Sequence, residues 1–553
     1  MALVIIDGRE LVLPEGRRLN GIEAARLVGI EIPHYCWHPG LSVVGSCRMC
    51  LVEVGTRDPK TGRITMQPKL VPACNTPAVD GTVFVTNSEK VRQARARVEE
   101  GLLLRHPIDC PICDKAGECL LQDYHFLHGQ PERRADLRPY TSRRRDIGDV
   151  SLFVDRCIMC SRCVRFTREI SGTSELMISG RGTHEEIDVF PGRPLHNNLS
   201  GNVVDLCPVG ALADKDFLYR QRVWFMRSHR AVCTGCAVGC SIWIDENQDR
   251  IYRLRPRPNP LVNKWWICNE GRYGYHYVHD LRRLVRPLRR DGQAVHELDW
   301  NRLPGELLDR LRSAAPLAAV VSPFLSVEEA YMLCKLMRSL DSRAVLACGP
   351  VPIAGEDQHF PGGFVVLAEK CPNRRGVEAV LAHFAGRVVA FAELLQQLAE
   401  GAVRSVWVAG GYPAPWIDQQ QAQQFDGLQL LIVQDLFPSP LSERATYVLP
   451  SAAFAEREGS YVNRNDWLQT STWAIRPPSG VRPEGQLYWQ MLGLPGLYNS
   501  RTILDEVARN IGFFSAATCE IPETGLDLRV NLLADQHMDV QRQAMDIQRQ
   551  ANA

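Results

Sequence analysis

The sequence lacks the long apolar run that a membrane-spanning helix requires. No stretch approaches the roughly 20 apolar residues needed to cross a bilayer, and residues 1–9 lack the basic start and apolar stretch of a signal peptide. An excess of one charge is also missing, because 64 Lys and Arg balance 63 Asp and Glu. This balance gives no reason to expect a nucleic-acid partner. We therefore expect a cytoplasmic protein that reaches a membrane only through a partner.

Nucleotide-binding motifs are missing as well. We find neither a GxGxxG run after a strand nor a P-loop, so the chain itself is not expected to bind a nicotinamide or a nucleotide phosphate. There is no internal repeat or low-complexity tract. The 553 residues are too many for one ordinary core, so several domains are expected.

Cysteine is the residue that the chain has in abundance, with 19 in all. In a reducing compartment, that number favours metal or redox chemistry over disulfides. Most of the cysteines precede residue 270, and the exceptions are Cys334, Cys348, Cys371 and Cys519. The first half of the chain is therefore predicted to carry the chemistry.

The first candidate ligand set combines a close pair of cysteines with two more distant ones. Its members are Cys36, Cys47, Cys50 and Cys74. A 2Fe–2S cluster needs four cysteine sulfurs, and the glycines of this loop, Gly40 and Gly45, would let backbone amides approach the cluster. A zinc site is the alternative interpretation.

The second set joins one histidine to three closely spaced cysteines. Its members are His106, Cys110, Cys113 and Cys119. An isolated histidine is usually only packed or exposed, but these three cysteines have no fourth thiolate nearby, and imidazole nitrogen can replace sulfur on iron. His106 is therefore a candidate iron ligand beside the three cysteines. His125 and His128, further downstream, are interpreted as non-ligands.

The third set has the spacing of a bacterial ferredoxin. Its members are Cys157, Cys160, Cys163 and Cys207, the last of them followed by a proline. A ferredoxin with two clusters would need four more thiolates, but those positions hold Thr167, Asn197, Ser200 and Val203. Because all four second-cluster ligands are replaced together, the segment is predicted to hold a single 4Fe–4S cluster.

The fourth set begins with a CxxC pair, for which zinc is again the alternative. Its members are Cys233, Cys236, Cys240 and Cys268.

The four cysteines outside these sets have simpler interpretations. Cys334 shares a helical face with apolar residues, Cys348 ends a strand-like run, and Cys371 and Cys519 have no partner at ligand spacing.

Local patterns predict the main elements of secondary structure. Strands are expected over residues 3–6, 11–13, 50–54 and 83–86 around a helix at 21–28, followed by a charged helix at 89–104. Beyond about residue 283, a helix at 326–340 alternates with strands at 344–347, 405–408 and 428–433. That alternation is typical of an α/β layer domain. The last fifteen residues are expected to form a loose helical tail.

The order of the four sets resembles the large iron–sulfur subunit of respiratory complex I, the family of 75-kDa-type subunits. The segment after the fourth set, Cys-Asn-Glu-Gly-Arg, also resembles the start of molybdopterin oxidoreductases. In the second half, residues 446–450 (Thr-Tyr-Val-Leu-Pro) and 453–463 (Ala-Phe-Ala-Glu-Arg-Glu-Gly-Ser-Tyr-Val-Asn) are similar to the family's motif. The family commonly has Glu-Gly-Arg where this chain has Asn465, Asp466 and Trp467, and its region after the fourth set is longer.

The resemblance implies a multidomain α+β and α/β protein. Its expected parts are a β-grasp 2Fe–2S ferredoxin-like domain (1–84), a histidine-ligated 4Fe–4S segment (85–145), a single-cluster bacterial ferredoxin-like domain (146–222), a molybdopterin-oxidoreductase-type 4Fe–4S domain (226–282) and a shortened molybdopterin-oxidoreductase-like α/β domain (283–553). One 2Fe–2S and three 4Fe–4S clusters are expected, with no molybdopterin and no flavin.

The resemblance also implies a function in electron transfer. A flavin-bearing partner subunit would oxidise NADH, and this chain would relay single electrons toward quinone, with proton translocation in the whole complex. It would lie peripherally on the cytoplasmic side of the inner membrane, with no substrate-converting site of its own. The alternatives are a NAD-linked formate dehydrogenase, which needs a longer pterin-binding region and a molybdenum ligand, and a NAD-reducing hydrogenase subunit.

Overall fold

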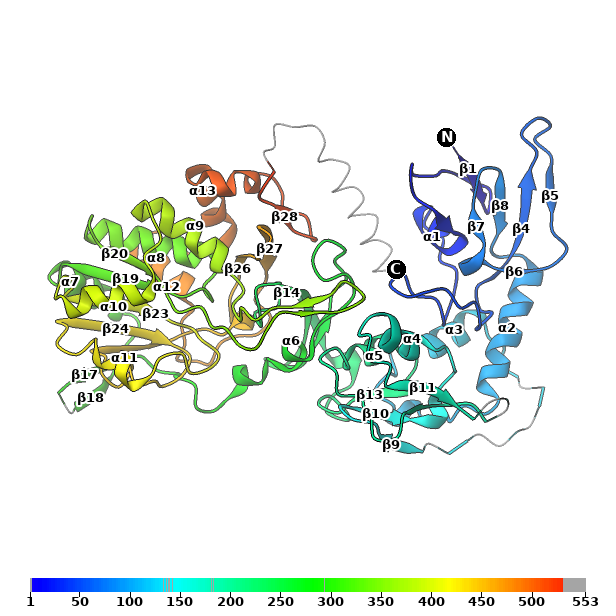
Figure 1. The fold of residues 1–553 in the computed structure, drawn as a ribbon, viewed down its shortest axis with the longest axis horizontal. Coiled ribbons are helices and arrows are strands. Elements are labelled where there is room, and N and C mark those ends of the chain that lie inside the picture. The colour runs from blue at the N-terminus through cyan, green and yellow to red at the C-terminus, as the bar shows by residue number, and fades with distance from the viewer. Residues whose placement is uncertain are drawn as a thin grey trace.

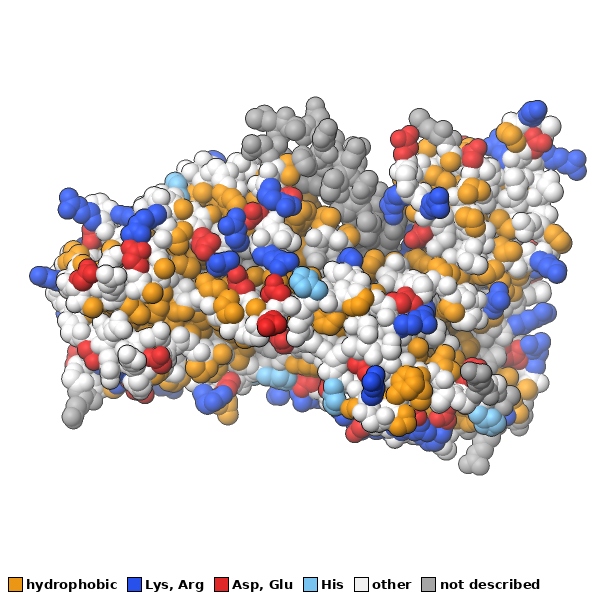
Figure 2. Space-filling model, viewed as in Figure 1, with side chains coloured by type: hydrophobic (Ala, Val, Ile, Leu, Met, Phe, Trp, Pro, Cys, Tyr) orange, Lys and Arg blue, Asp and Glu red, His pale blue; other side chains and the backbone are white. Residues whose placement is uncertain are grey.

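The computed structural model describes residues 2–530, apart from 133, 136, 138, 139, 142, 181, 183 and 293. The domains follow one another along the long axis, with the amino-terminal sheet at one end and the largest sheet at the other (Figure 1). Basic and acidic side chains are interspersed over the face shown in Figure 2, as the balanced composition predicts. The expected tail at the carboxyl terminus lies outside the described residues.

The amino-terminal domain is a mixed sheet that packs against one helix. Its strands run in the order β2-β1-β8-β4-β5, with β1 and β8 parallel and β6 paired to β4. A capping box between Asn20 and Glu23 starts the helix α1 (Gly21–Leu27). The strands are β1 (Leu3–Ile6), β2 (Arg9–Val12), β4 (Leu51–Arg57), β5 (Ile64–Met66), β6 (Val71–Pro72) and β8 (Thr82–Val85), with β3 (Leu19–Asn20) and β7 (Pro77–Ala78) forming a separate pair. The predicted strands and helix are confirmed to within a few residues.

Helical and ferredoxin-like segments follow this domain. The helix α2 (Glu89–Leu103) begins at the cap residue Ser88, as the charged stretch predicts, and packs against α3 (Leu120–His128). A small antiparallel sheet then positions two short helices that carry cysteine sets. These elements are β9 (Arg144–Asp146), β10 (Val150–Phe153), η3 (Val154–Arg156), α4 (Arg162–Glu169), the hairpin β11 (Leu176–Ser179) and β12 (Glu186–Val189), α5 (Asn202–Leu206) and β13 (Leu212–Asp214).

A three-stranded antiparallel sheet joins the two ends of the molecule. It consists of β14 (Arg227–Val232), β15 (Ser241–Asn247) and β16 (Arg250–Pro256), and the short helix α6 (Asn269–Tyr273) follows. In Figure 1 this region lies between the ferredoxin-like segment and the large carboxyl-terminal sheet.

The carboxyl-terminal domain is a helix-covered sheet with the order β18-β17-β25-β24-β23-β19-β20. Along β19 (Leu317–Val321), alternate residues contribute to two different hydrophobic cores, so helices cover both faces. The other strands are β17 (Leu288–Asp291), β18 (Ala294–Glu297), β20 (Val345–Cys348), β23 (Ser405–Ala409), β24 (Leu430–Asp435) and β25 (Tyr447–Pro450). This arrangement confirms the predicted alternation of helix and strand.

Helices of this domain lie in two layers. Helices α7 (Leu303–Arg312), α8 (Val327–Leu340), α9 (Arg374–Ala385), α12 (Glu484–Met491) and α13 (Ser500–Asn510) contribute to one core, and α10 (Phe391–Ala399) and α11 (Gln419–Gln423) to the other. The strands β26 (Gly459–Val462), β27 (Trp467–Ser471) and β28 (Leu526–Asp527) form a separate small sheet. Cys334 on α8 is fully buried, as its helical face predicts. Among the described residues, no helix has the length and apolarity to span a bilayer.

Candidate functional site

The first cysteine set lies in the loops beside the amino-terminal sheet. The thiols of Cys36 and Cys47 share a hydrogen bond, and so do those of Cys50 and Cys74. The hydrogen bond from Cys47 lowers the pKa of Cys36. The structure thus brings the four predicted members together as two neighbouring pairs.

Helix α4 connects this first set to the third. Arg162 donates from Nη2 to the carbonyl of Trp37 at 2.6 Å, and Arg165 donates to the carbonyl of Cys36. Both arginines lie in the helix that carries Cys163. Buried guanidinium groups therefore hold the main chain of one cysteine loop against the element that presents another.

The second set converges on one cavity. All four predicted members line it: His106, Cys110, Cys113 and Cys119. Gly210 closes one side, where an added Cβ would lie 2.1 Å from the sulfur of Cys113. His125 and His128 are not among the lining residues.

Burial sets the protonation of the histidine in this cavity. Burial and, to a lesser extent, the charge of Arg156 together lower the pKa of His106 to about 4, against the opposing charge of Asp109. A neutral imidazole can donate a ring nitrogen to a metal. A main-chain carbonyl of this set is also held in place, because Arg222 donates from Nη2 to the carbonyl of Cys110 at 2.9 Å.

The third set also lines a single cavity. Its four predicted members are all present there: Cys157, Cys160, Cys163 and Cys207. Burial raises the pKa of Cys160 to about 11, and the amide of Met159 donates to the sulfur of Cys157 at 3.3 Å. The enclosure is mostly apolar, with thiols facing one another across it.

Two hydrogen-bonded polar side chains and one buried valine stand at three of the positions where a second ferredoxin cluster would need thiolates. Ser200 donates to a carboxylate oxygen of Asp149 at 2.7 Å, and Asn197 donates to Glu175 at 3.0 Å. Val203 is fully buried in the core. The sequence showed which thiolates were missing, but it did not show that hydrogen bonds to Asp149 and Glu175 had taken the place of two of them.

The fourth set is buried, with Cys233, Cys236 and Cys240 in the loop between β14 and β15 and Cys268 at the start of α6. Burial raises the pKa of Cys268, and the nearby thiols of Cys233 and Cys236 raise it further. The amide of Gly271 donates to the sulfur of Cys268 at 3.3 Å, and the amide of Cys233 donates to the carbonyl of Cys240 at 2.8 Å. These contacts place the four predicted residues around one small region.

The carboxyl-terminal domain holds the loop of this fourth set. Asn463 donates to the carbonyl of Val238 at 3.0 Å, and Gln469 donates to the carbonyl of Gly239 at 2.6 Å. On the other side, the amide of Ala237 donates to the carbonyl of Glu369 at 3.0 Å. Sequence reasoning missed these supports, although Asn463 lies in a segment that it had singled out.

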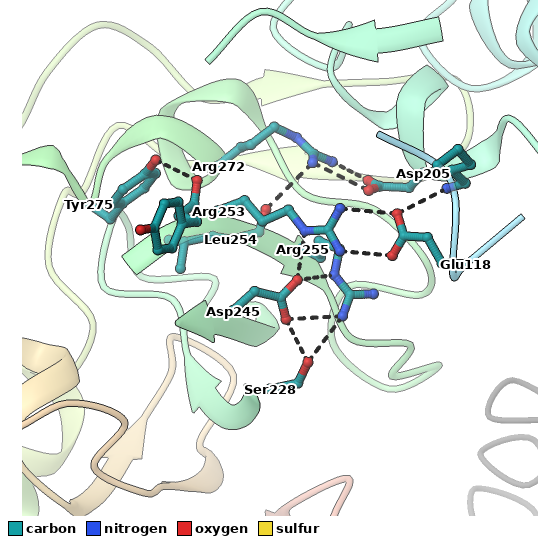
Figure 3. Close-up of polar contacts among 11 residues, drawn as sticks. Glu118, Asp205, Ser228, Asp245, Arg253, Leu254, Arg255, Arg272 and Tyr275 are labelled. Carbon is teal, nitrogen blue, oxygen red and sulfur yellow. Dashed lines mark hydrogen bonds and ion pairs between the residues drawn. The ribbon is translucent and has the colours of Figure 1, made fainter. Parts of the chain in front are cut away.

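An ion-pair network lies among three of the sets (Figure 3). Its two groups, around Arg253 and Arg272, are connected by a hydrogen bond of 3.5 Å from Nη1 of Arg272 to the carbonyl of Leu254. Arg253 donates to Glu118 at 2.8 and 3.0 Å and to Asp245 at 2.7 Å, while Arg272 pairs with Asp205. Burial alone would raise the pKa of Glu118, but Lys115 and Arg253 outweigh it and hold that pKa at about 2.

Several members of the network are also close neighbours of candidate ligands in the sequence. Glu118 precedes Cys119, Asp205 lies two residues before Cys207, and Arg272 follows Cys268 by four residues.

Among the described residues, no three His, Cys, Asp or Glu side chains are grouped as ligands of a single metal ion. All 19 cysteines are free thiols.

Five protein-family models match the chain in the order of these domains. Their descriptions are a 2Fe–2S cluster binding domain (3–89), an NADH-ubiquinone oxidoreductase-G iron–sulfur binding region (95–134), the ferredoxin-like domain of NADH-quinone oxidoreductase subunit 3 (149–213), a molybdopterin oxidoreductase Fe4S4 domain (226–280) and molybdopterin oxidoreductase (380–492).

Curated relatives carry names from one enzyme complex. The NADH-quinone oxidoreductase G subunit of Rickettsia typhi is 35% identical over 346 residues, which are 62% of this chain and 49% of the relative. The NADH-ubiquinone oxidoreductase 75 kDa subunit of Reclinomonas americana is 35% identical over 58% of this chain and 46% of its own length. The G subunit of Salmonella typhimurium is 35% identical over 56% of this chain and 34% of its own length. The chain thus spans about half or less of the relatives' length.

A solved structure of a NAD+-reducing [NiFe]-hydrogenase in the H2-reduced state is 29% identical. The match covers 40% of this chain and 91% of the hydrogenase chain, with a TM-score of 0.33.

The domain order and the matched families define the class: a multidomain protein with 2Fe–2S and 4Fe–4S binding domains. Within that class, the chain is similar to the G subunit of NADH-quinone oxidoreductase over 56–62% of its own length.

Proposed function

We propose that the chain relays electrons within an NADH:quinone oxidoreductase, from a flavin-bearing subunit toward quinone. The observation that carries this proposal is the convergence of the one histidine and three cysteines of the second set on a single cavity. A second cavity, lined by the ferredoxin-type cysteines, lies nearby, and Gly210 borders the first cavity only three residues after Cys207.

The residues present fit iron–sulfur clusters. The proposed ligands of the 2Fe–2S cluster are Cys36, Cys47, Cys50 and Cys74. Those of the three 4Fe–4S clusters are His106, Cys110, Cys113 and Cys119; Cys157, Cys160, Cys163 and Cys207; and Cys233, Cys236, Cys240 and Cys268. Their thiols are free, and backbone amides donate to the sulfurs of Cys157, Cys233 and Cys268. Amides directed at ligand sulfurs are a feature by which proteins stabilise such clusters.

When bound, the clusters would supply one-electron oxidation and reduction. The chain's own residues hold the loops, exclude water and place fixed charges. Arg162 and Arg165 hold the first loop, Arg222 holds the second, and Asn463 and Gln469 hold the fourth. We propose that the other hydrophilic subunits of complex I bind this chain and keep it peripheral to the membrane on its cytoplasmic side.

We propose that the carboxyl-terminal domain is a scaffold for the fourth set and binds no molybdopterin. The proposal is supported by hydrogen bonds from this domain to the fourth set. Glu369, Asn463 and Gln469 all bond to the main chain between Cys236 and Cys240. A domain can retain a fold without retaining the catalysis found in its relatives.

Purification of the full chain with its native partners would test the proposal. We expect a flavin-bearing subunit among the partners, NADH-dependent reduction of the clusters, and about 14 iron atoms per chain from one 2Fe–2S and three 4Fe–4S clusters. Reproducible iron near 18 would indicate a second ferredoxin cluster. One molybdenum per chain with formate-dependent reduction of the clusters would replace the proposal with a formate dehydrogenase, and H2-dependent reduction would replace it with a hydrogenase.

A further inference from the structure

One charged side chain reaches the cavity of the second set from the segment that carries the third. Arg156 ends η3, directly before Cys157, and its side chain is only 3% exposed. Its guanidinium lines the cavity that holds His106 and the three cysteines of the second set. It also lines the neighbouring cavity bordered by Arg253 and Arg272, so it lies between the histidine cavity and the ion-pair network of Figure 3.

Three contacts hold this guanidinium in place. Nε donates to Oδ2 of Asp109 at 3.0 Å, and Nη1 donates to the carbonyl of Gly210 at 3.4 Å. The guanidinium carbon lies 4.0 Å from the centre of the Phe153 ring. A cation stacked on an aromatic face and paired at its edge has little freedom to swing away.

The charge of Arg156 matters because a cluster becomes more negative when it is reduced. Guanidinium stays charged at any physiological pH, and burial weakens the screening of its field. Asp109 has the opposite charge and lines the same cavity. The two side chains therefore act on the reduced state with opposite signs.

We propose that Arg156 raises, and Asp109 lowers, the reduction potential of the cluster held by the second set. The inference rests on the proposed function, since it requires a cluster at this site. Arg156 acts through space on the cluster and is not a ligand. Arg222, which binds the carbonyl of Cys110, adds a further positive charge nearby and is left unchanged in the test.

The test is a redox titration of the full chain, followed by electron paramagnetic resonance. The signal of the second cluster is assigned as the one that changes in His106→Cys. In Arg156→Gln, we expect this cluster alone to be about tenfold less reduced at a fixed potential, which is ~59 mV for a one-electron couple. One charge roughly 12 Å away would produce a shift of this size at an effective dielectric constant of about 20, so the expected shift is a lower bound for a side chain that lines the cavity itself. Arg156→Lys, which keeps the charge, should shift the potential less.

A matched control uses the neighbouring arginine on the same ring. Arg144 lies 5.9 Å from the centre of the Phe153 ring but does not line the cavity, and its side chain is 43% exposed. Arg144→Gln should leave every potential unchanged. An equal shift in this control would show that the effect of Arg156→Gln was not specific to the cavity, and would overturn the proposal.

The acidic partner provides a second variant with the opposite sign. Asp109→Asn should raise the potential of the same cluster, and the double variant with Arg156→Gln should return it toward the wild-type value. The Asp109→Asn measurement tests the proposal even if the Arg156→Gln variant loses its cluster. An unchanged potential in Asp109→Asn, or a fall, would overturn the proposal. A wild-type protein with no His106-dependent signal would instead overturn the proposed function.

Discussion

Gly210 is the position where a single methyl group should have the largest effect on one cluster. An alanine there would place its Cβ 2.1 Å from the sulfur of Cys113 and 3.3 Å from the Cβ of Lys115. Non-bonded carbon contacts normally lie at about 3.5–4.0 Å, so the sulfur or the main chain would have to move by more than about 1 Å. Overpacking of this kind costs roughly 1–3 kcal/mol.

The displacement should matter more for the cluster than for the fold. Ligand sets need their positions fixed to within about 0.5 Å, so we expect Gly210→Ala to fold but to lose the second cluster. Iron content should fall by about four atoms per chain, and the His106-dependent resonance signal should disappear. The 2Fe–2S signal should remain, because its ligands belong to another loop.

A second glycine provides the matched control. Gly101 is exposed near the end of α2, and among the described residues no atom beyond its chain neighbours and its own helix backbone lies within 4 Å of the Cβ that an alanine would add. Gly101→Ala should keep all clusters and stabilise the helix by about 0.5–1 kcal/mol. Full iron content and an unaltered second-cluster signal in Gly210→Ala would refute the reasoning.

Three further variants test separate parts of the structure. His106→Cys should keep a cluster but lower its potential, because thiolate adds negative charge where neutral imidazole stood; unchanged potentials and spectra for every cluster would remove His106 from the ligand set. Asn463→Ala removes the bond to the carbonyl of Val238 and should make the fourth cluster alone more labile during purification, whereas Asn465→Ala, at an exposed neighbour, should not. Burial raises the pKa of Glu328 from 4.5 to about 7, so the folded state keeps a proton that the unfolded state releases. Stability contributed by this group should therefore fall by an order of 3 kcal/mol as pH rises from about 4.5 to 7, and Glu328→Gln should remove that part of the fall in thermal unfolding measurements. Identical pH profiles for wild type and Glu328→Gln would contradict this assignment.

Sequence patterns predicted elements that depend on local chemistry. The strand at residues 3–6 and the helix at 326–340 follow from residue type and periodicity, and the structure confirms both to within a residue. The four cysteine sets were also visible as spacings, and members of each set lie near one another in the fold.

Contacts between distant segments could not be predicted in this way. Gln469 bonds to Gly239 across 230 positions, and nothing in either segment specifies the other. In the sequence, nothing distinguishes Arg156 from other arginines that lie near a cysteine. Only the packing of η3 against residues 106–119 places it at the histidine cavity. Tertiary packing decides which of many arginines is buried beside a candidate cluster.

The support of the fourth cysteine loop has a consequence for sequence variation. Asn463, Gln469 and Glu369 all bond to main-chain atoms of residues 237–239 and not to their side chains. Gly239 has a φ of +59°, a left-handed conformation that strains most other residues. Val238, half-buried between these anchors, can be exchanged for other residues of similar size without altering the path of the loop. Homologous chains should therefore drift at this position while the cysteines on either side stay in place.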